Sequence, residues 1–464
     1  MAIATTNPST GEQLREFEPL TDEQLRQALD RATRAFESYR DTTFAQRAGW
    51  LRRAAEILEA EAEQLGELAT LEMGKTFGAA VAEVRKSAAG CRYYAENAEG
   101  MLADDPWPVD GARVFTRHQP LGPVLAVMPW NFPYWQVFRF AAPALMAGNV
   151  GLLKHASNVP QVALAIEDVL RRAGFPEGVF QTLLVSSGAI EGVIADERVR
   201  AVTLTGSEGA GREVGAAAGR NIKTSVLELG GADAFIVMPS ADMDTAVRSA
   251  VSSRILNNGQ SCINAKRFVV HQDVADEFVR RLVEGMEALR IGDPKAEGTD
   301  LGPLSSAQAV QELDQQVRGT VDAGARLLTG GKPLGGAGNY YPPTVLTDVP
   351  EGSPGHREEF FGPVALVWRA ADVDDAIRIA NDSRFGLGGS AWTADEREQQ
   401  RFATEVETGM IYINEVTAST PEVPFGGAKD SGYGRELADY GPRAFVNAKT
   451  VWISQRGASG DAVE

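Results

Sequence analysis

The first hundred residues show the apolar repeat, every three or four positions, that is typical of amphipathic helices. Thr21 and Gln24 have the spacing of a capping box, which starts a helix. The apolar positions that follow fall on one face of that helix: Leu25, Leu29, Ala32 and Phe36. A similar repeat continues over residues 51–65. We therefore expect helices in this region, packed through their apolar faces.

Short apolar runs alternate with helical patterns from residue 121 onward. The runs have the length of buried strands and lie at residues 124–128, 150–154, 179–185, 199–205 and 224–229. Helical patterns lie between them, for example over residues 136–147 and 159–172. This alternation predicts an α/β fold with a mainly parallel, doubly wound sheet. Ligands of such sheets bind beyond the carboxyl ends of the strands.

A second α/β region follows over residues 235–392 and predicts a second domain. Two further strand patterns, at residues 113–119 and 449–454, fall outside both α/β regions. Proline and glycine cluster between residues 330 and 343, as in a surface loop. Residues 457–464 have the composition of a frayed polar tail.

Charge and composition narrow the function classes. The 464-residue chain has 63 acidic and 45 Lys or Arg side chains, a formal net charge of −18, which argues against nucleic acid and anionic membrane surfaces. Two cysteines cannot form a disulfide framework, and residues 1–13 lack the apolar core of a secretion signal, so we expect a cytoplasmic protein. No apolar run reaches membrane-spanning length. Four scattered histidines predict no metal site.

Cys262 is the first candidate for chemistry. It follows Gly259, Gln260 and Ser261, and glycine with small polar neighbours allows a ligand to approach the backbone closely. A nucleophilic thiol fits this setting. The alternative interpretation is a small buried apolar residue, the common fate of a free cysteine.

Two predicted turns at strand ends carry candidate binding groups. Asn131 lies between two prolines and two aromatic residues in the turn 129–133, and its amide suits oxyanion stabilisation. Alternatively, it bonds its own backbone in a buried turn. Gly206 and Ser207 join a strand to a helix, where backbone N–H groups can bind phosphate. The run is neither a dinucleotide fingerprint nor a P-loop.

Two acidic residues are further candidates. Glu228 precedes Gly230 and Gly231 at the end of a predicted strand, and a buried carboxylate there has the raised pKa of a general base. A helix-capping carboxylate is the alternative. Glu359 lies beside two aromatic residues and suits binding of ribose hydroxyls, whereas a solvated charge pair before a strand is the simpler interpretation.

Together these runs resemble the aldehyde dehydrogenase superfamily over nearly the whole chain. The matching segments, in order, lie at residues 129–133, 153–154, 205–207, 228–231, 259–262, 359–363 and 424–427. Within the superfamily, residues 153–160 and 135–139 are most similar to succinate-semialdehyde dehydrogenases. The resemblance implies oxidation of succinate semialdehyde to succinate. Open alternatives are another carboxylated or general aldehyde, such as glutarate semialdehyde, and a non-catalytic relative that keeps the fold.

The resemblance also implies residue roles. Cys262 would add to the aldehyde carbon, the Asn131 amide and the Cys262 N–H would bind the oxyanion, and Glu228 would activate the hydrolytic water. The residues implied to bind the cofactor are Pro129, Trp130, Lys154, Ser157, Gly206, Ser207, Glu359 and Phe361.

Cofactor choice follows from a departure from the family pattern. Many relatives carry, at the position of Ser157, a glutamate that binds the free 2′-hydroxyl of NAD and repels a 2′-phosphate. Ser157 removes that charge while Lys154 stays close. NADP is therefore the expected cofactor, with NAD as the alternative.

Substrate choice needs a local cation in a chain of negative charge. Arg139 matches the position of a substrate-binding arginine in succinate-semialdehyde relatives, and Ser419 or Thr420 matches a substrate-binding hydroxyl. A surface salt bridge is the alternative for Arg139. Some relatives carry a second arginine where this chain has Leu256, which could broaden the substrate range.

The resemblance implies three structural parts. A Rossmann-like cofactor domain would span residues 1–98 and 121–230, and a catalytic domain residues 231–436. A small β oligomerisation arm, residues 99–120 and 437–464, would give a homodimer or homotetramer.

Overall fold

The computed structural model describes residues 2–454, so the tail predicted at residues 457–464 lies outside the described part. The chain begins with an antiparallel hairpin, β1 (Ile3–Thr6) and β2 (Gln13–Phe17), where helices were expected. Four residues of β2 are exposed, so its apolar pattern is too weak to predict a strand.

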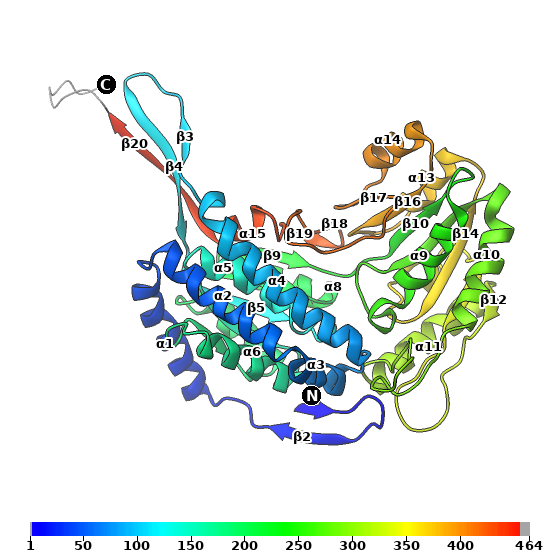
Figure 1. The fold of residues 1–464 in the computed structure, drawn as a ribbon, viewed down its shortest axis with the longest axis horizontal. Coiled ribbons are helices and arrows are strands. Elements are labelled where there is room, and N and C mark those ends of the chain that lie inside the picture. Colours follow the sequence, from blue (N-terminus) through cyan, green and yellow to red (C-terminus); the bar gives the residue numbers. More distant parts are fainter. Residues whose placement is uncertain (1, 455–464) are drawn as a thin grey trace.

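Four helices follow the hairpin: α1 (Asp22–Tyr39), α2 (Phe44–Ala60), α3 (Ala62–Met73) and α4 (Phe77–Met101). The predicted capping box of α1 is confirmed. The Thr21 hydroxyl accepts a hydrogen bond from the Gln24 N–H at 3.2 Å, and the Gln24 side-chain oxygen accepts one from the Thr21 N–H at 2.8 Å. Figure 1 shows α2 and α4 side by side, and both bury an alanine-rich face.

The first sheet has the strand order β19-β9-β8-β5-β6-β7, and all its neighbouring pairs except β19-β9 are parallel. Its strands are β5 (Pro123–Met128), β6 (Val150–His155), β7 (Phe180–Thr182), β8 (Ala201–Thr205), β9 (Thr224–Glu228) and β19 (Gly432–Tyr433). The connecting helices are α5 (Trp135–Met146), α6 (Pro160–Arg172), α7 (Ile190–Ala195) and α8 (Glu208–Arg220). The predicted doubly wound parallel sheet is therefore present.

The edge strand β19 comes from a segment that was expected in the catalytic domain. Gly432 pairs with Glu228, and a Cβ on Gly432 would lie 2.0 Å from the carbonyl oxygen of Leu227. Only glycine therefore allows the chain to return this close to β9. Residues 432–433 thus add to the first sheet, a long-range pairing that no local pattern in the sequence predicts.

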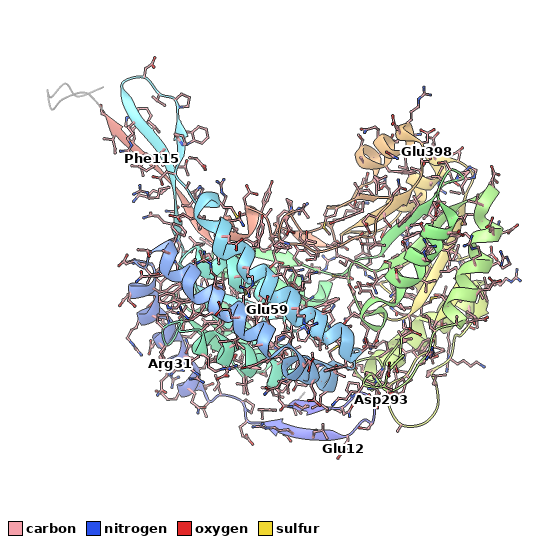
Figure 2. All side chains as sticks on the ribbon, viewed as in Figure 1. Glu12, Arg31, Glu59, Phe115, Asp293 and Glu398 are labelled. Carbon is pink, nitrogen blue, oxygen red and sulfur yellow. The ribbon has the colours of Figure 1, made fainter. Side chains whose placement is uncertain are left out.

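The second sheet has the order β12-β13-β14-β11-β10-β16-β17. Its strands are β10 (Asp233–Val237), β11 (Ala265–His271), β12 (Arg326–Thr329), β13 (Thr344–Thr347), β14 (Val364–Ala370), β16 (Gly389–Trp392) and β17 (Tyr412–Ile413). The longer helices of this region are α9 (Met243–Ile255), α10 (Gln272–Glu287), α11 (Ala307–Asp322), α13 (Val373–Asn381) and α14 (Glu396–Glu405). Figure 1 shows this region beside the first sheet, and Figure 2 shows the side chains on the elements of both regions.

A three-stranded arm extends away from both sheets (Figure 1). It consists of β3 (Asp105–Trp107), β4 (Ala112–Pro120) and β20 (Val446–Ser454), all antiparallel. The two strands predicted outside the α/β regions are thus confirmed. The remaining short elements are β15 (Phe385–Gly386), β18 (Ala428–Lys429), α12 (Pro354–Arg357), α15 (Tyr440–Arg443) and the 3₁₀ turns η1 (Ser187–Ala189) and η2 (Leu256–Gly259).

Candidate active site

A cavity of about 590 Å³ lies beyond the carboxyl ends of β5, β8 and β9. This is where a doubly wound sheet binds its ligands. The predicted site residues that line the cavity are Pro129, Trp130, Asn131, Gly206, Ser207, Cys262, Glu359 and Phe361. The predicted residues outside its lining are Glu228, Arg139, Lys154, Ser157, Ser419 and Thr420. A separate cavity of about 640 Å³ between α10 and β12–β14 contains none of these residues.

The loop that carries Cys262 has an unusual backbone. Asn257, Asn258 and Gly259 have φ values of 57°, 58° and 76°, in the left-handed region. A Cβ on Gly259 would lie 2.4 Å from the carbonyl carbon of Gly362, so glycine is required by both conformation and space. The two asparagines tolerate this conformation because their short polar side chains bond nearby backbone.

Buried side chains hold this loop in place. Arg254, which is fully buried, donates hydrogen bonds of 2.6 Å to the carbonyl oxygens of Gly259 and Gly362. Asn258 donates to the carbonyl oxygens of Gly74 and Pro303 at 2.8 and 2.9 Å. These contacts satisfy backbone oxygens that burial would otherwise leave unpaired.

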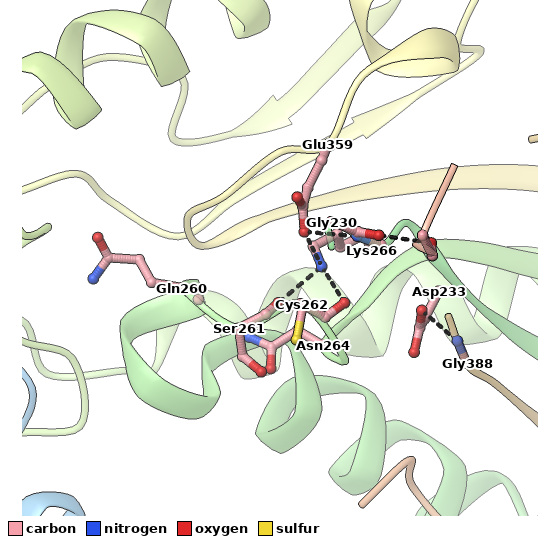
Figure 3. A network of polar contacts seen from close by, with 12 residues as sticks. Gly230, Asp233, Gln260, Ser261, Cys262, Asn264, Lys266, Glu359 and Gly388 are labelled. Atoms are coloured by element: carbon pink, nitrogen blue, oxygen red, sulfur yellow. Dashed lines mark hydrogen bonds and ion pairs between the residues drawn. The ribbon is translucent and has the colours of Figure 1, made fainter. Parts of the chain in front are cut away.

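Lys266 holds the backbone of the Cys262 segment in place (Figure 3). Its Nζ donates to the carbonyl oxygens of Ser261 and Cys262, both at 2.8 Å, and forms an ion pair with Glu359 Oε1 at 2.9 Å. Glu359 also accepts a hydrogen bond from the Gly231 N–H at 3.2 Å. Sequence reasoning missed Lys266 and Arg254, although charged residues inside apolar segments were a usable signal.

The surroundings of Cys262 keep its thiol protonated. The side chain is partly exposed to the cavity, yet the protein around the sulfur raises the pKa of the Cys262 thiol to about 12 because it disfavours the charged form. Lys266 and Arg139 oppose this effect through their positive charge. The thiol therefore needs a proton acceptor to react as a thiolate near neutral pH.

Asn131 lies against the same loop. Its side-chain Nδ2 donates to the backbone carbonyl oxygen of Gln260 at 3.1 Å, and the backbone carbonyl oxygen of Asn131 accepts from Asn257 Nδ2 at 2.8 Å. A primary amide has two N–H groups, so one remains for a ligand. Asn131 and Cys262 both line the cavity, so the remaining N–H group is on the same cavity as the thiol.

Glu228 ends β9 as a buried carboxyl group, and neither of its oxygens has a hydrogen-bond partner among the described residues. Burial raises the pKa of Glu228 well above its usual value, and the nearby Glu436 carboxylate adds to this rise. Arg139 and Arg435 lower it in part. A carboxyl group with free oxygens and a raised pKa has the properties of a general base or acid near neutrality.

Gly426 gives Glu228 its space. An ideal Cβ on Gly426 would lie 2.6 Å from Glu228 Oε1, and the residue has a φ of +152°. The Pro-Phe-Gly-Gly segment at 424–427 therefore packs directly over the carboxyl group. Glu436 is 4% exposed. Like Lys266 and Arg254, it is a buried charged residue of the site that the sequence did not reveal.

Arg139 lies near the Glu228 and Glu436 carboxyl groups, and its charge is already paired. Its side chain is 3% exposed, its Nε lies 2.5 Å from Glu436 Oε2, and its Nη2 donates to Thr205 Oγ1 at 3.0 Å. The guanidinium also lies over the Phe425 ring at 4.4 Å. The role of Arg139 in substrate binding stays a prediction.

Ser419 is held by the first turn of α5. The Trp135 Nε1 donates to Ser419 Oγ at 3.0 Å, and Ser419 is 5% exposed. Its hydroxyl proton is free to point to a ligand. The neighbouring Thr420 is half-buried.

The cofactor candidates divide between the cavity and the end of β6. Ser207 caps α8 and brings the positive end of that helix to the cavity. Trp130 and Phe361 meet edge to face with centroids 5.8 Å apart. Lys154 is buried, and no acceptor for its Nζ lies within hydrogen-bond distance among the described residues. A buried lysine without a partner and a helix N-terminus both suit the anionic and hydroxyl groups of a dinucleotide.

Two further features of the described residues bear on the site. No group of three or more histidine, cysteine, aspartate or glutamate side chains in residues 2–454 is arranged to hold a metal ion. Within the same residues, every helix is too short or too polar to span a bilayer.

Known proteins resemble this chain in both sequence and fold. Relatives with 59% identity are succinate-semialdehyde dehydrogenase (NADP+) 1 of Mycobacterium ulcerans, over 98% of this chain and 100% of the relative, and succinate-semialdehyde dehydrogenase (NADP+) of Mycobacterium avium, over 100% and 98%. The solved succinic semialdehyde dehydrogenase of Streptococcus pyogenes, in complex with NADP+, matches with a TM-score of 0.95 and 38% identity over 97% of this chain and 99% of that chain. This structure confirms the predicted fold class.

The match to the family itself is nearly complete. The aldehyde dehydrogenase family pattern covers residues 1–451, which include the cavity, the Cys262 loop and Glu228. The chain belongs to the aldehyde dehydrogenase family.

Proposed function

We propose that the protein oxidises succinate semialdehyde to succinate with NADP as the hydride acceptor. The observation that carries the proposal is the partly exposed Cys262 thiol in the cavity that Asn131 also lines, in a chain of this family. The buried Glu228 directly precedes Leu229, which lines the same cavity. The relatives at 59% identity are named for this substrate and for NADP+.

Cys262 begins the proposed reaction. Its sulfur, once deprotonated, forms a bond to the aldehyde carbon and gives a thiohemiacetal. The free N–H of the Asn131 amide and the Cys262 backbone N–H stabilise the negative charge on the oxygen. When bound, NADP supplies the acceptor for the hydride that leaves this carbon, and a thioester on Cys262 results.

Glu228 then promotes hydrolysis. Its carboxylate accepts a proton from water as the water oxygen attacks the thioester carbon. The C–S bond breaks, the acid product leaves and Cys262 is free again. Burial raises the pKa of Glu228, so its carboxylate is a stronger base than that of an exposed glutamate.

The residues proposed to hold the cofactor fit its separate parts. Ser207 and the N–H groups at the start of α8 would bind the pyrophosphate, while Glu359 and Lys154 would bind ribose hydroxyls. Ser157 provides a neutral hydroxyl where a 2′-phosphate would lie. Glu359 must then exchange part of its present contact with Lys266 for the ribose.

The distal carboxylate of the substrate needs cationic and hydroxyl partners. Arg139, Ser419 and Thr420 are the partners proposed from the sequence. We further propose a cytoplasmic homodimer or homotetramer assembled through the β3-β4-β20 arm, because this arm carries exposed apolar side chains.

Steady-state kinetics test the proposal directly. The purified protein is assayed by NADPH absorbance with succinate semialdehyde, glutarate semialdehyde and butanal, each with NADP and with NAD. The proposal expects the highest kcat/KM for succinate semialdehyde with NADP. Equal kcat/KM for butanal and succinate semialdehyde would indicate a general aldehyde dehydrogenase, and no reduction of either cofactor would contradict an enzymatic role.

A further inference from the structure

Lys86 is a cation beside the substrate-binding candidates, and within residues 2–454 it has no anionic partner. It lies on α4 and is only partly exposed. Among the described residues, no carboxylate lies within ion-pair distance of its Nζ and no acceptor within hydrogen-bond distance. A largely buried ammonium group without a counter-ion is unfavourable unless a ligand supplies the negative charge.

One aromatic side chain connects Lys86 to the proposed substrate hydroxyl. Lys86 Nζ lies over the Trp135 ring, 4.6 Å from its centroid, and the same indole donates to Ser419 Oγ at 3.0 Å. Gly90, one helical turn beyond Lys86, permits this packing, because a Cβ there would lie 2.9 Å from a ring carbon of Trp135. A cation and a hydroxyl are thus held by contacts with one rigid ring.

The other charged groups around Lys86 are already occupied or too far away. Glu83 pairs with Lys75 and accepts hydrogen bonds from the Tyr134 and Trp135 N–H groups at 2.8 and 2.9 Å. Glu422 is exposed and influences Lys86 only at longer range.

Arg139 is no counter-ion for Lys86, because it is itself a cation, and its guanidinium is paired with Glu436. Burial first, and then the positive charge of Arg139, lower the pKa of Lys86 to about 8. The lowered pKa means that the protein disfavours the protonated form of Lys86, and a bound anion would stabilise that form.

We propose that Lys86, together with the Ser419 hydroxyl, binds the distal carboxylate of the aldehyde substrate and so selects carboxylated aldehydes. The inference rests on the proposed function, since it names the partner for the carboxylate of that substrate. Two donors at one carboxylate, one of them charged, give both orientation and affinity. The positive charge of Arg139 then acts mainly on the carboxyl groups of Glu228 and Glu436.

Lys86→Met removes the charge and keeps the length of the side chain. In the presence of saturating NADP, we expect KM for succinate semialdehyde and the inhibition constant of succinate to rise about tenfold or more, with kcat nearly unchanged. Kinetics with butanal should stay within about twofold, because that aldehyde has no carboxylate. Lys86→Arg should restore most of the affinity.

Arg85→Met is the matched control, because it removes a cation from the neighbouring, exposed position of the same helix. It should leave all constants unchanged. If the wild type prefers succinate semialdehyde to butanal and Lys86→Met keeps the wild-type KM, Lys86 is not the carboxylate partner although the proposed function stands. Equal losses for butanal would also overturn the inference, as a structural effect. If the wild type shows no preference for carboxylated aldehydes, the proposed function fails first.

Discussion

At the scale of single residues, Cys262 differs from Cys91 in what surrounds the sulfur. Cys91 is fully buried in α4, whereas Cys262 lines the cavity and lies near the charges of Lys266 and Arg139. Reactivity of a thiol depends on access and on stabilisation of its thiolate. Of the two cysteines, Cys262 alone has access to the cavity, and two cations, Lys266 and Arg139, oppose the rise of its thiol pKa.

Cys262→Ala should therefore abolish aldehyde oxidation while the protein still binds NADP. Cys91→Ala is the matched control and should keep most of the activity, because it removes only a buried sulfur. NADPH formation measures the first effect, and fluorescence titration with the cofactor measures the second. Substantial oxidation by Cys262→Ala would show that the nucleophile is another group.

Ser157, which follows the end of β6, is the residue that we propose sets the choice between NADP and NAD. Ser157→Glu should shift the ratio of kcat/KM for NADP to that for NAD by about tenfold or more towards NAD, because a carboxylate repels the 2′-phosphate and accepts bonds from a free 2′-hydroxyl. Ser157→Ala serves as the uncharged control, with a much smaller shift expected. An unchanged ratio in Ser157→Glu would place the 2′ position elsewhere.

At the scale of elements, the segment from α9 through η2 to β11 fixes the position of Cys262. Three consecutive left-handed residues, the buried Arg254 and the Lys266 ammonium determine its path. The strain of such a backbone persists only where many contacts hold it.

Gly259→Ala tests this element. The new methyl group would overlap Gly362 at a backbone φ that disfavours alanine, so we expect a loss of about 2 kcal/mol or more in the free energy of unfolding and a large fall in kcat. Gly78→Ala, in α4, should be neutral or slightly stabilising, because no atom beyond its chain neighbours and the local helix backbone lies within 4 Å of the position that its Cβ would take. Thermal denaturation of both variants measures the difference, and equal melting temperatures would contradict the role given to Gly259.

The sequence was most informative where structure is local. The capping box at Thr21 and Gln24 and the strands that end before Asn131 and Ser207 follow from periodicity and cap chemistry. The β1-β2 hairpin and the pairing of β19 with β9 were not predictable, because exposed or two-residue strands lack an apolar pattern. The roles of the site residues came from resemblance, and periodicity alone left each of them open.

Partners across long sequence distances could not be predicted either. Arg139 was identified as a cation near the site, yet no local pattern connects it with Glu436. Likewise, no local pattern marks Lys86 as part of the site, because its sequence context is that of an ordinary helix lysine. Contacts of this kind depend on how α4, α5 and the segments on either side of β18 pack in three dimensions.

At the scale of the whole molecule, the arm presents apolar side chains to solvent. Trp107, Trp452 and Ile453 are 55%, 60% and 48% exposed, and β20 pairs with β4 along nine residues. Apolar groups gathered on a projecting sheet are typical of an interface between subunits.

Trp452→Glu should weaken the proposed homo-oligomer, because it places a charge in an apolar contact. Ile222→Glu, at an exposed position outside the arm, is the matched control and should keep the wild-type assembly. Analytical ultracentrifugation at micromolar concentration distinguishes the species. A monomeric wild type would contradict the assignment of the arm.

The proposed reaction depends on two residues, Cys262 as the carrier of the acyl group and Glu228 as the base for its hydrolysis. Glu228→Gln keeps the shape of the side chain but cannot accept a proton, so the thioester should form in a burst of NADPH and then persist. The mass of this variant after mixing with succinate semialdehyde and NADP tests both roles together. We expect one added succinyl group on the peptide that contains Cys262. Fast steady turnover without any adduct on Cys262 would contradict both assignments.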